Sequence, residues 1–355
     1  KVLSKNFSMF PINNEVDLER EWTYKQVWDT LPKFKKGDRV VSVDSDALCF
    51  RIAAACDTKT ILVSNGKKVR EFKTRTEFKK LCKDKGWDYS KFSIEDKVVS
   101  EDVSHCLATL KRAIRNLKER FDATHMYHFL GGKHNARCDL KLPVQYKSNR
   151  SGAARPTHLK ECRDYLIKNH GAFVVTGVEA DDLVQGLSQH LVNETEAYGI
   201  AFNLDKDFNQ SLLFNRFYNP IKDTVTELSG GLGKLWLEND KVKGEGLLWL
   251  MQQLMISDPS DAYFMNSHYI KKYGEKSFYK DFKDCKGEKE LLTKVVSKWK
   301  ELLPESIEYT SWCGEAMKPT WLELAELYMA CCYMKTSPND ETTFESLLKE
   351  YEVEY

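Results

Sequence analysis

Gly177-Val178-Glu179-Ala180-Asp181-Asp182 stands between an apolar run, Ala172–Val175, and a helix-like run, Leu183–Val192. Three carboxyl groups therefore lie where a buried strand meets the start of a helix. In α/β proteins this junction opens onto the edge of the sheet that binds ligands. Taken alone, the three acids fit two interpretations equally well. They could cap the helix, because acids in a first turn complement the helix dipole, or they could bind a cation that relieves their mutual repulsion.

The same pattern of a strand followed by acids recurs along the chain. Arg39–Asp44 is typical of a buried strand that ends in an acid and feeds an apolar helix, Ala47–Cys56. A second strand is expected over His125–Leu130, and a strand over Gly199–Leu204 leads into Asp205-Lys206-Asp207. Strands and helices that alternate in this way indicate a mostly parallel sheet.

Acids from four separate segments would meet at one edge of such a sheet, because the carboxyl ends of parallel strands share that edge. Helix capping does not explain the complete set. Carboxylates without matching histidine or cysteine ligands favour Mg²⁺ or Mn²⁺ over zinc. Two such ions can activate a water and stabilise the leaving oxygen of a phosphodiester. The set comprises Asp44, Glu179, Asp181, Asp182, Asp205, Asp207, Asp258 and Asp261.

A basic segment at residues 57–105 interrupts the alternation of strands and helices. Asn65-Gly66 fits the turn of a hairpin between Thr60–Ser64 and Lys67–Phe72, and Arg75–Lys85 is a candidate basic helix. From residue 67 to residue 85, nine basic residues stand against three acids, although the complete chain has a net charge of only +1. Two interpretations stay open for this segment: contact with phosphate groups or an ordinary solvated face.

The composition indicates a globular protein with a sizeable core, because 42% of the 355 residues are hydrophobic and 30% are charged. No apolar run approaches the ~20 residues of a membrane span, and no signal-peptide pattern opens the sequence. We therefore expect a cytoplasmic protein that does not bind membranes. The ten cysteines are scattered, which favours buried free thiols over zinc clusters or disulfides. The sequence has no P-loop, nucleophile elbow or dinucleotide fingerprint.

These motifs resemble the 5′-nuclease superfamily of flap endonucleases and 5′→3′ exonucleases, and most closely its bacteriophage exonucleases. The similarity spans roughly residues 39–265. The Tyr-Lys-x-Asn-Arg and Val-Glu-Ala-Asp-Asp elements are specific together, whereas the Asp-x-Asp elements are weak alone. In the order of the family, the matching residues are Val43-Asp44-Ser45-Asp46 with Leu48 and Phe50-Arg51, Arg137, Tyr146-Lys147-Ser148-Asn149-Arg150, Gly177 to Asp182, Asp205-Lys206-Asp207 and Asp258-Pro259-Ser260-Asp261.

The resemblance implies a PIN-like α/β fold, with a mostly parallel central sheet flanked by helices. A mainly helical C-terminal region with a degenerate helix-hairpin-helix would follow. We expect an N-terminal extension at residues 1–38 with a helix around Leu18–Leu31, a catalytic domain at 39–256 and the helical region at 257–355. The catalytic domain would contain the basic insertion at 57–105 and an arch-like region at 137–170.

The function implied by the resemblance is that of a metal-dependent 5′→3′ exonuclease or 5′-flap endonuclease. Such an enzyme hydrolyses phosphodiesters near DNA 5′ ends in phage replication or recombination, and a phage-encoded enzyme would act in the host cytoplasm. The expected partners are DNA with 5′ ends, flaps or RNA primers. A single-strand-binding protein and a polymerase are further candidate partners.

The same resemblance implies the role of each residue. Asp44, Glu179, Asp181 and Asp182 would hold the first of two Mg²⁺ or Mn²⁺ ions. Asp205 and Asp207 would bridge toward the second ion, which Asp258 and Asp261 complete. Lys147 and Arg150 would stabilise the charge that develops at the scissile phosphate, so they join Asp44 and Asp205 as catalytic candidates. The expected DNA-binding residues are Arg137, Tyr146, Lys147, Arg150, Arg155, Lys271 and Lys272. Tyr146 has two open roles, stacking on an unpaired base or packing within the protein.

Three stretches depart from the family pattern. Leu130-Gly131-Gly132 stands where an acid follows the second strand, and Asp139 is displaced from that place. Ser257 replaces the glycine of the Gly-Asp-x-x-Asp element. Residues 262–269 lack the glycines that let a helix-hairpin-helix backbone approach phosphate. The departures motivate an alternative, a nuclease-derived DNA-binding protein with little catalytic activity. A third interpretation is an RNA-directed nuclease of the wider PIN class.

Overall fold

The computed structural model describes residues 16–152 and 154–355, which form two compact units. Unit 1 contains the chain up to Asp44, Ala123–Ser151 and Asp164–Tyr355, and unit 2 contains Ser45–Asp122 and Gly152–Arg163. The first fifteen residues of the expected N-terminal extension lie outside the described residues. The domain boundaries expected from the sequence are not tested by this division into units, and they remain predictions. None of the helices in the described part of the chain is long and apolar enough to cross a membrane.

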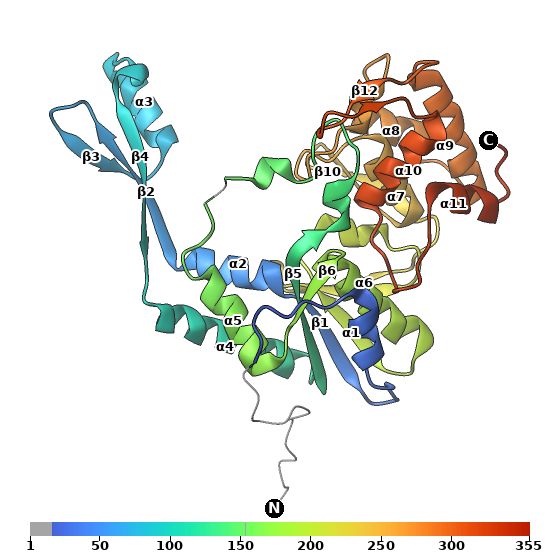
Figure 1. The fold of residues 1–355 in the computed structure, drawn as a ribbon, viewed down its shortest axis with the longest axis horizontal. Coiled ribbons are helices and arrows are strands. Elements are labelled where there is room, and N and C mark those ends of the chain that lie inside the picture. The colour runs from blue at the N-terminus through green and yellow to red at the C-terminus, as the bar shows by residue number, and fades with distance from the viewer. Residues whose placement is uncertain (1–15, 153) are drawn as a thin grey trace, which may run out of the picture. The chain divides into compact units, whose positions relative to one another are not determined.

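Unit 1 is built on a six-stranded sheet (Figure 1). Neighbouring strands pair parallel, except that the last one joins antiparallel at the edge. The central strand is buried along almost its entire length, as in sheets covered on both faces. The mostly parallel sheet expected from the sequence is confirmed. In spatial order the strands are β6 (Phe173–Gly177), β5 (His125–Asn135), β1 (Arg39–Asp44), β7 (Tyr198–Phe202), β8 (Asn215–Asn219) and β9 (Thr224–Leu228).

Helix α6 (Ala180–Glu194) lies against the sheet along β1, β5, β7 and β8 (Figure 1). Its buried residues Leu183, Leu187 and Leu191 recur with the period of a helix face. The Ser42 hydroxyl of β1 donates to the Val184 carbonyl of α6 at 3.0 Å. This packing fixes the start of α6, and therefore the acids there, relative to the central strand.

The N-terminal segment packs on the same sheet. Trp22 pairs with Val175 as a parallel bridge at the edge of β6. Helix α1 (Tyr24–Thr30) follows, with Thr23 as its N-cap, and Tyr24 and Val27 enter the core that α6 forms with the sheet. The helix is shorter than the expected Leu18–Leu31, because the residues before Thr23 are engaged in pairing with β6.

The order of the strands reverses at β1, because β5 and β6 lie on one side of it and β7 and β8 on the other. Open α/β sheets bind ligands outside the carboxyl ends of the strands at such a reversal. Asp44 is the last residue of β1, and Asp205 follows shortly after β7. The topology therefore brings acids from distant parts of the sequence to the favoured ligand-binding edge.

The strand expected over His125–Leu130 is longer than predicted. After an irregularity that begins at Gly131, the backbone pairs with β6 again where Asn135 faces Gly177. β5 therefore ends at Asn135, and Gly131-Gly132 lies inside the strand. The last residue of the strand is Asn135.

The C-terminal part of unit 1 is mainly helical. Its helices share one apolar core, in which Trp299, Tyr328 and Phe344 are fully buried. Residues 257–274, where a degenerate helix-hairpin-helix was expected, contain one 3₁₀ turn, η5 (Met265–His268). The helices are α7 (Gly246–Met255), α8 (Glu275–Phe282), α9 (Glu288–Leu302), α10 (Trp321–Cys332) and α11 (Phe344–Glu350). Two hairpins were not expected from the sequence. They are β10–β11 (Lys234–Glu238, Lys241–Glu245) and β12–β13 (Tyr309–Thr310, Ala316–Met317).

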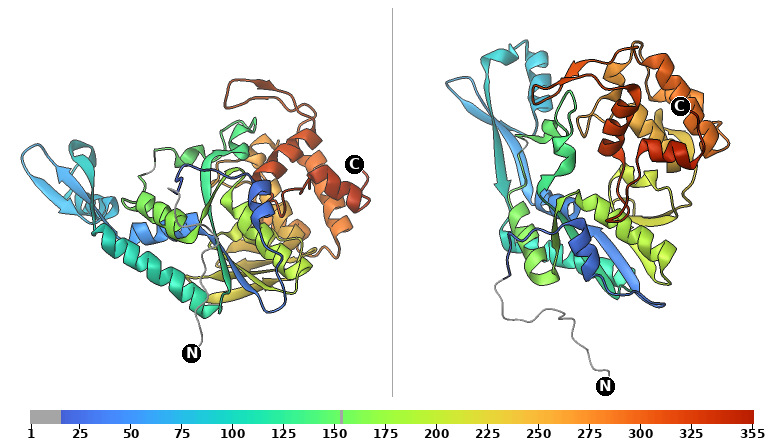
Figure 2. Two further views of the ribbon diagram at one scale, coloured as in Figure 1. Left: turned by 60° about the horizontal axis from the view of Figure 1, so that its bottom comes forward. Right: turned by 45° about the vertical axis from the view of Figure 1, so that its right-hand side comes forward.

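Unit 2 contains the basic insertion, a three-stranded antiparallel sheet in the order β3-β2-β4 with one helix (Figure 2). The expected hairpin and basic helix are confirmed, whereas β4 was not predicted. The elements of unit 2 are α2 (Ser45–Ala55), β2 (Asp57–Ser64), β3 (Val69–Phe72), α3 (Arg75–Lys85), η1 (Tyr89–Lys91), β4 (Ser93–Ser100) and α4 (Val103–Arg120); α5 (Leu159–His170) begins in unit 2 and ends in unit 1.

All ten cysteines are free thiols, and eight of them are buried. The expectation of buried free thiols is confirmed for these eight. Cys106 and Cys162 of unit 2 approach each other with a Sγ–Sγ distance of 3.5 Å. Burial raises the pKa of the Cys106 thiol to about 11, so this thiol is protonated at neutral pH and resists oxidation.

The buried His128 of β5 makes the stability of unit 1 sensitive to acid. Burial and the neighbouring His170 lower the pKa of His128 to about 3. In the unfolded chain the imidazole takes up a proton near pH 6.5, so stability falls as pH drops below 6.5, by up to ~1.4 kcal/mol per pH unit. We expect His128→Leu to flatten the decline in the free energy of unfolding between pH 6.5 and 5, measured by urea denaturation. The exposed His105 is the control, and His105→Leu should retain the parental slope. Equal slopes in the two variants would contradict the prediction.

Candidate active site

The first group of acids lies where β6 passes into α6. Gly177 ends the strand with a φ of +80°, a left-handed conformation that glycine adopts without strain. Glu179 is the N-cap of α6, and its backbone N–H donates to Asp182 Oδ2 at 3.0 Å. Capping of the helix therefore engages the carboxyl group of Asp182. The carboxyl groups of Glu179 and Asp181 stand at the same junction with other partners.

Arg137 is buried among these acids. Its two terminal nitrogens donate to Asp182 at 2.9 and 2.8 Å, and Nη1 also donates to Glu179 at 3.0 Å. The guanidinium further donates to the carbonyls of Ala330 and Tyr333. Asp182 is 1% exposed, and its carboxylate receives several N–H donors, which is what a buried charge requires. Arg137 and Asp182 thereby join the edge of the sheet to the end of α10.

The loop that precedes η3 (Ser148–Arg150) brings cations to two of the acids. Lys147 adopts a φ of +58°, which is uncommon for a residue with a side chain. Its backbone N–H donates to the Asp261 carbonyl at 2.8 Å, and its ammonium group bonds to the Glu179 carboxylate. Arg150 Nη2 donates to Asp261 Oδ1 at 2.5 Å. These contacts connect Glu179 of the first group with Asp261 of the second.

Tyr146 is enclosed between the two groups. The residue is 2% exposed, and its ring stacks on Tyr263 with a centroid distance of 6.5 Å. Its hydroxyl donates to Asp261 Oδ2 at 3.0 Å. Of the two roles considered for Tyr146, packing within the protein matches this geometry, because the ring is not offered to a base.

The second group of acids surrounds η4 (Lys206–Gln210). Asp205 caps this turn by accepting the Asp207 N–H at 3.0 Å. The Asp207 carboxylate accepts a hydrogen bond from Gln253 of α7. The Lys206 ammonium lies 2.8 Å from Asp258 Oδ2. The turn thus aligns acids from the end of β7 with acids that follow α7.

Electrostatic repulsion is strong within the first group. Burial raises the pKa of Asp181 well above its ordinary value, and the charges of Asp44, Glu179 and Asp205 raise it further. The opposing charge of Lys147 is too weak to offset them. Asp181 is therefore held among acids that come from the ends of three different strands.

The second group shows the same behaviour. Burial and the charges of Asp205, Asp258 and Asp261 raise the pKa of Asp207 well above its ordinary value. Burial also raises the pKa of Asp261. Asp205 acts on Asp207 as it acts on Asp181, so it is the residue that the two groups share.

Cations keep other acids of the site ionised. Burial alone would raise the pKa of Glu179, but the charges of Arg137 and Lys147 outweigh burial and lower it. For Asp258, burial likewise opposes ionisation, and the ion pair with Lys206 lowers the pKa. The site therefore mixes carboxyl groups that have a cationic partner with carboxyl groups that are crowded by like charge.

Eight acidic and four basic side chains make up the site. As these side chains lie, no three acidic, histidine or cysteine residues of the described ranges stand close enough together to enclose a metal ion. Several of the carboxyl groups instead bond to the basic side chains. The acids are those expected from the sequence: Asp44, Glu179, Asp181, Asp182, Asp205, Asp207, Asp258 and Asp261, and the cations are Arg137, Lys147, Arg150 and Lys206.

Asn135 is a site residue that the sequence did not reveal. Its side-chain Nδ2 donates to Glu179 Oε1 at 2.8 Å, and its Oδ1 accepts the Arg137 N–H at 3.0 Å. It was missed because the expected strand ended at Leu130. A strand that continues through two glycines has no clear signal in the sequence.

Three further amide side chains position the acids. Asn149 donates to the Pro259 carbonyl at 2.8 Å, which ties the loop of Lys147 to the turn that contains Asp258. Asn203 exchanges two hydrogen bonds with the backbone of Asp205, both at 2.8 Å. Gln253 is the third, through its bond to Asp207. Asn149 belongs to the Tyr-Lys-x-Asn-Arg motif, which was the available signal for its role.

Some expected residues lie outside this group. Lys271 forms an ion pair with Glu301 on the C-terminal part of unit 1, and Lys272 is exposed there. Arg155 belongs to unit 2. Asp139 is exposed and forms an ion pair with a neighbouring histidine. Of the four cations near the acids, Arg137, Lys147 and Arg150 were among the expected DNA-binding residues, and Lys206 was not.

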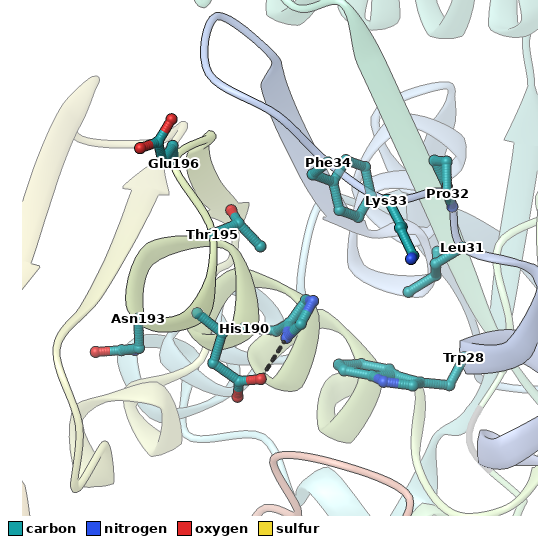
Figure 3. A pocket seen from close by; sticks show the side chains of 10 residues that line it. Trp28, Leu31, Pro32, Lys33, Phe34, His190, Asn193, Thr195 and Glu196 are labelled. Carbon is teal, nitrogen blue, oxygen red and sulfur yellow. Dashed lines mark hydrogen bonds and ion pairs between the residues drawn. The ribbon is translucent and has the colours of Figure 1, made fainter.

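A cavity of about 740 Å³ lies at the other edge of the sheet, near the residues that precede β1 and β7 (Figure 3). The Trp28 ring stands edge-on to His190 with a centroid distance of 5.2 Å, and His190 Nδ1 lies 3.0 Å from Glu194. None of the eight acids of the site lines this cavity. The chemistry of the carboxylates is therefore separate from it.

Comparison with known proteins finds similar folds but no close relative. No protein-family model matches the chain, and no curated protein matches it. The chain is similar to solved structures of bacteriophage T5 5′-nucleases. A T5 protein co-crystallised with metal ions shares 13% identity over 88% of this chain and 98% of its own, with a TM-score of 0.44. A mutant T5 5′-exonuclease shares 12% over 88% and 98%, with a TM-score of 0.40.

A complex of the bacteriophage T5 flap endonuclease with DNA and metal ions shares 14% identity. This match covers 88% of the present chain and 97% of the phage protein, with a TM-score of 0.41. All three similarities are remote in sequence and in geometry. The roles of the residues in this chain therefore rest on their own contacts and charges.

The buried ion pair of Arg137 and Asp182 predicts a large effect on stability. Arg137→Met leaves the buried Asp182 carboxylate without its cation and removes one of the two cations that pair with Glu179, so we expect the free energy of unfolding to fall by about 3–5 kcal/mol in urea denaturation. Adding Asp182→Leu to this variant should restore part of the loss. Arg150→Met, which removes a half-exposed guanidinium, serves as the control and should cost about 1 kcal/mol or less. A loss below about 1 kcal/mol for Arg137→Met would contradict the prediction.

Proposed function

We propose that this protein is a metal-dependent 5′ nuclease, a 5′→3′ exonuclease or 5′-flap endonuclease that hydrolyses phosphodiesters near DNA 5′ ends. The observation that carries the proposal is the pair of overlapping carboxylate groups that share Asp205. They lie outside the carboxyl ends of β1 and β7, where the strand order reverses. Cations that reach the same acids from the loop of Lys147 and Arg150 support a phosphate-bearing substrate.

The charge of the site supports two divalent ions. If all eight acids are ionised, their negative charge exceeds the positive charge of the four cations by about four, which two divalent cations would neutralise. The donors are all oxygens, which suits Mg²⁺ or Mn²⁺. The raised pKa values of Asp181 and Asp207 express the free-energy cost of crowding these groups. Binding of a divalent cation would remove that cost.

We assign the ligands to two sets. The first ion would be held by Asp44, Glu179, Asp181 and Asp205, and the second by Asp205, Asp207, Asp258 and Asp261. Asp182 receives a different role from the one expected from the sequence. Both of its oxygens already accept hydrogen bonds from Arg137, so it acts as a positioning residue that fixes the start of α6.

When bound, the two ions supply an activated water and a Lewis acid for the leaving oxygen. Lys147 and Arg150 hold the acids of both sets through salt bridges. A substrate phosphate offers these cations an alternative anionic partner once the carboxylates serve as ligands. Lys147 and Arg150 would then orient the phosphate and stabilise its developing negative charge. Asn135 keeps Glu179 oriented throughout, because its amide donates to Oε1.

One observation favours a second candidate function, a DNA-binding protein with little catalytic activity. Asn135 stands at the end of β5, so this strand ends in an amide and not in an acid. An amide oxygen binds a divalent ion more weakly than a carboxylate, so one ion could be lost. The two candidates differ in a measurable way, because only the nuclease releases products that depend on metal.

Metal binding should be visible in stability, independently of activity. We expect saturating Mn²⁺ or Mg²⁺ to raise the melting temperature of the parent protein, with a stabilisation of about 2.7 kcal/mol at 100 times the Kd. Asp205→Asn removes the shared ligand and one repulsive charge. The variant should therefore melt at or above the parent temperature in EDTA and respond much less to metal. A parent protein whose melting temperature is the same with and without metal would contradict two-ion binding.

Cleavage of a 5′-end-labelled flap duplex and a blunt duplex tests the function. The parent should release short 5′ products with Mg²⁺ or Mn²⁺ and none with EDTA. Asp205→Asn should abolish the products while DNA binding in EDTA remains. Lys147→Gln should slow cleavage by about 10²–10³-fold, as expected for loss of a group that stabilises transition-state charge. Asp139→Asn, at an exposed acid outside the site, is the control and should cleave like the parent. A clear gel shift without any metal-dependent product would favour the DNA-binding alternative.

A further inference from the structure

The inserted segment Asp57–Ser100 of unit 2 has its own hydrophobic core. Ile61 and Val63 of β2 pack with Phe78 and Cys82 of α3. Phe92 completes the cluster, with its ring edge-on to Phe78 at a centroid distance of 5.1 Å. We name Asp57–Ser100 the basic module. Its core means that the polar residues on its surface are held in fixed positions by the sheet and the helix.

Helix α3 has a clear inner and outer face. Thr74 caps its start, and Gly86 ends it in a left-handed conformation with a φ of +65°. Phe78 and Cys82, one helical turn apart, point into the core. Lys79, Lys80 and Lys83 are exposed and fall within about 100° of the helix circumference on the outer face. We name these three lysines the α3 lysine face.

Most acids of the basic module accept hydrogen bonds or form ion pairs within unit 2. The module contains twelve basic and seven acidic residues. Five of the acids accept specific bonds within unit 2: Asp57 from Thr157, Glu71 from Thr60 and Lys97, Glu77 from Lys73, Asp88 from Ser90, and Asp96 from Arg75. The module therefore has five more basic than acidic residues, and most of its acids are fixed in specific contacts.

Most cations of the basic module have no ion-pair partner within the described residues. In the described part of the chain, Arg75 and Lys97 are the module cations that form ion pairs. Lys79 lies 5.2 Å from the centroid of the Tyr89 ring, a contact that leaves its charge in place. The remaining lysines of α3 and of the hairpin tip at Lys67 and Lys68 form no ion pair within the described residues. The module therefore presents a concentration of positive charge that the near-neutral chain as a whole does not have.

We propose that the α3 lysine face binds the phosphodiester backbone of DNA without reading its sequence. Lys79 and Lys83 are four residues apart, ~6 Å along the helix axis. This spacing is close to ~6.8 Å, the rise of two nucleotide steps along one strand. Lysines bind phosphate as point charges and carry no fork of donors for base recognition. The module would thus hold substrate DNA by a second contact, distinct from the carboxylate site.

A membrane surface fits the module less well than DNA. Basic helices that bind membranes bury an exposed apolar face in the lipid. In α3 the apolar residues Phe78 and Cys82 are already buried in the module core. The α3 lysine face that remains for a partner carries positive charge and no large apolar side chain, which suits the anionic phosphate groups of DNA.

The test is DNA binding by the full chain in EDTA, where no metal-dependent cleavage occurs. The test variant carries Lys79→Gln, Lys80→Gln and Lys83→Gln, which keep the helix because glutamine is a good helix former. We expect the Kd for a fluorescent duplex to rise on the order of 10- to 100-fold near 0.1 M salt. The slope of log Kd against log salt should fall by about 2–3, at ~0.9 per lost phosphate contact. Replacing the same lysines by arginine should preserve the parental binding.

A second triple variant controls for the loss of charge. Lys280→Gln, Lys286→Gln and Lys289→Gln remove three exposed lysines from α8, α9 and the segment between them in unit 1, and this variant should bind DNA like the parent. Equal binding by the parent and the α3 variant, or an equal loss in both triple variants, overturns the proposal. Anionic lipid vesicles form a further arm, and binding to vesicles in place of DNA also overturns it.

The proposal rests on the proposed nuclease function only for the choice of DNA as partner, and the two can fail separately. If the parent releases no product but binding depends on the α3 lysine face, the nuclease assignment fails and the binding face stands. If the parent cleaves DNA and the α3 variant binds and cleaves like it, the binding face fails. When both hold, the variant should lose kcat/KM through a higher KM, with kcat at saturating DNA retained.

Discussion

Repulsion between buried carboxyl groups is the constraint on which the site depends. Asp181 and Asp207 are each buried among other acids, and both have a raised pKa for that reason. Such crowding is unfavourable unless an opposing charge is present. The fold supplies part of that charge through Arg137, Lys147 and Lys206. Under the proposed function the remainder would come from divalent cations, so that the repulsion that lowers the stability of the protein would also create affinity for these ions.

The cations that oppose the acids differ in how firmly the fold holds them. Arg137 is enclosed and bound to Asp182 and to backbone carbonyls, so it belongs to the framework. Lys147 and Arg150 come from a loop, and the Arg150 side chain is 56% exposed. A partner that competes for the carboxylates can release these two cations but not Arg137. This difference separates the residues that build the site from those that can act on a substrate.

Much of the site could be predicted from the sequence because its acids follow strands, and parallel strands carry their carboxyl ends to one edge. Six of the eight acids were expected from this pattern, Asp258 and Asp261 were expected at a helix end, and the cations Arg137, Lys147 and Arg150 were expected from the family resemblance. The role of Asp182 was not, because a capping acid and a metal-binding acid have the same signature at a helix start. Asn135 was missed because pairing with β6, a long-range contact, extends β5 beyond its two glycines.

The fold could be predicted from the sequence to a similar extent. The hairpin around Asn65-Gly66 and the helix α3 have strong local signals, and both are present. Strand β4 has three consecutive charged residues followed by two exposed valines, so it lacks the alternation of a half-buried strand, and it pairs along the edge of β2. The short helix α1 depends in the same way on the pairing of Trp22 with β6. Elements that are stabilised by distant partners were the ones the sequence did not reveal.

The net charge of the chain is only +1, but acidic and basic residues are concentrated on different surfaces. A carboxylate cluster repels DNA unless metal ions or cations intervene, so a nuclease needs positive charge that the acids do not consume. In unit 1, the cations near the acids are already bonded to them. In the basic module the relation is reversed, because hydrogen bonds and ion pairs occupy most of the acids and leave the lysines of α3 available. Under the two proposals, a chain of nearly zero net charge would bind divalent cations through its acids and phosphate groups through the lysines of α3.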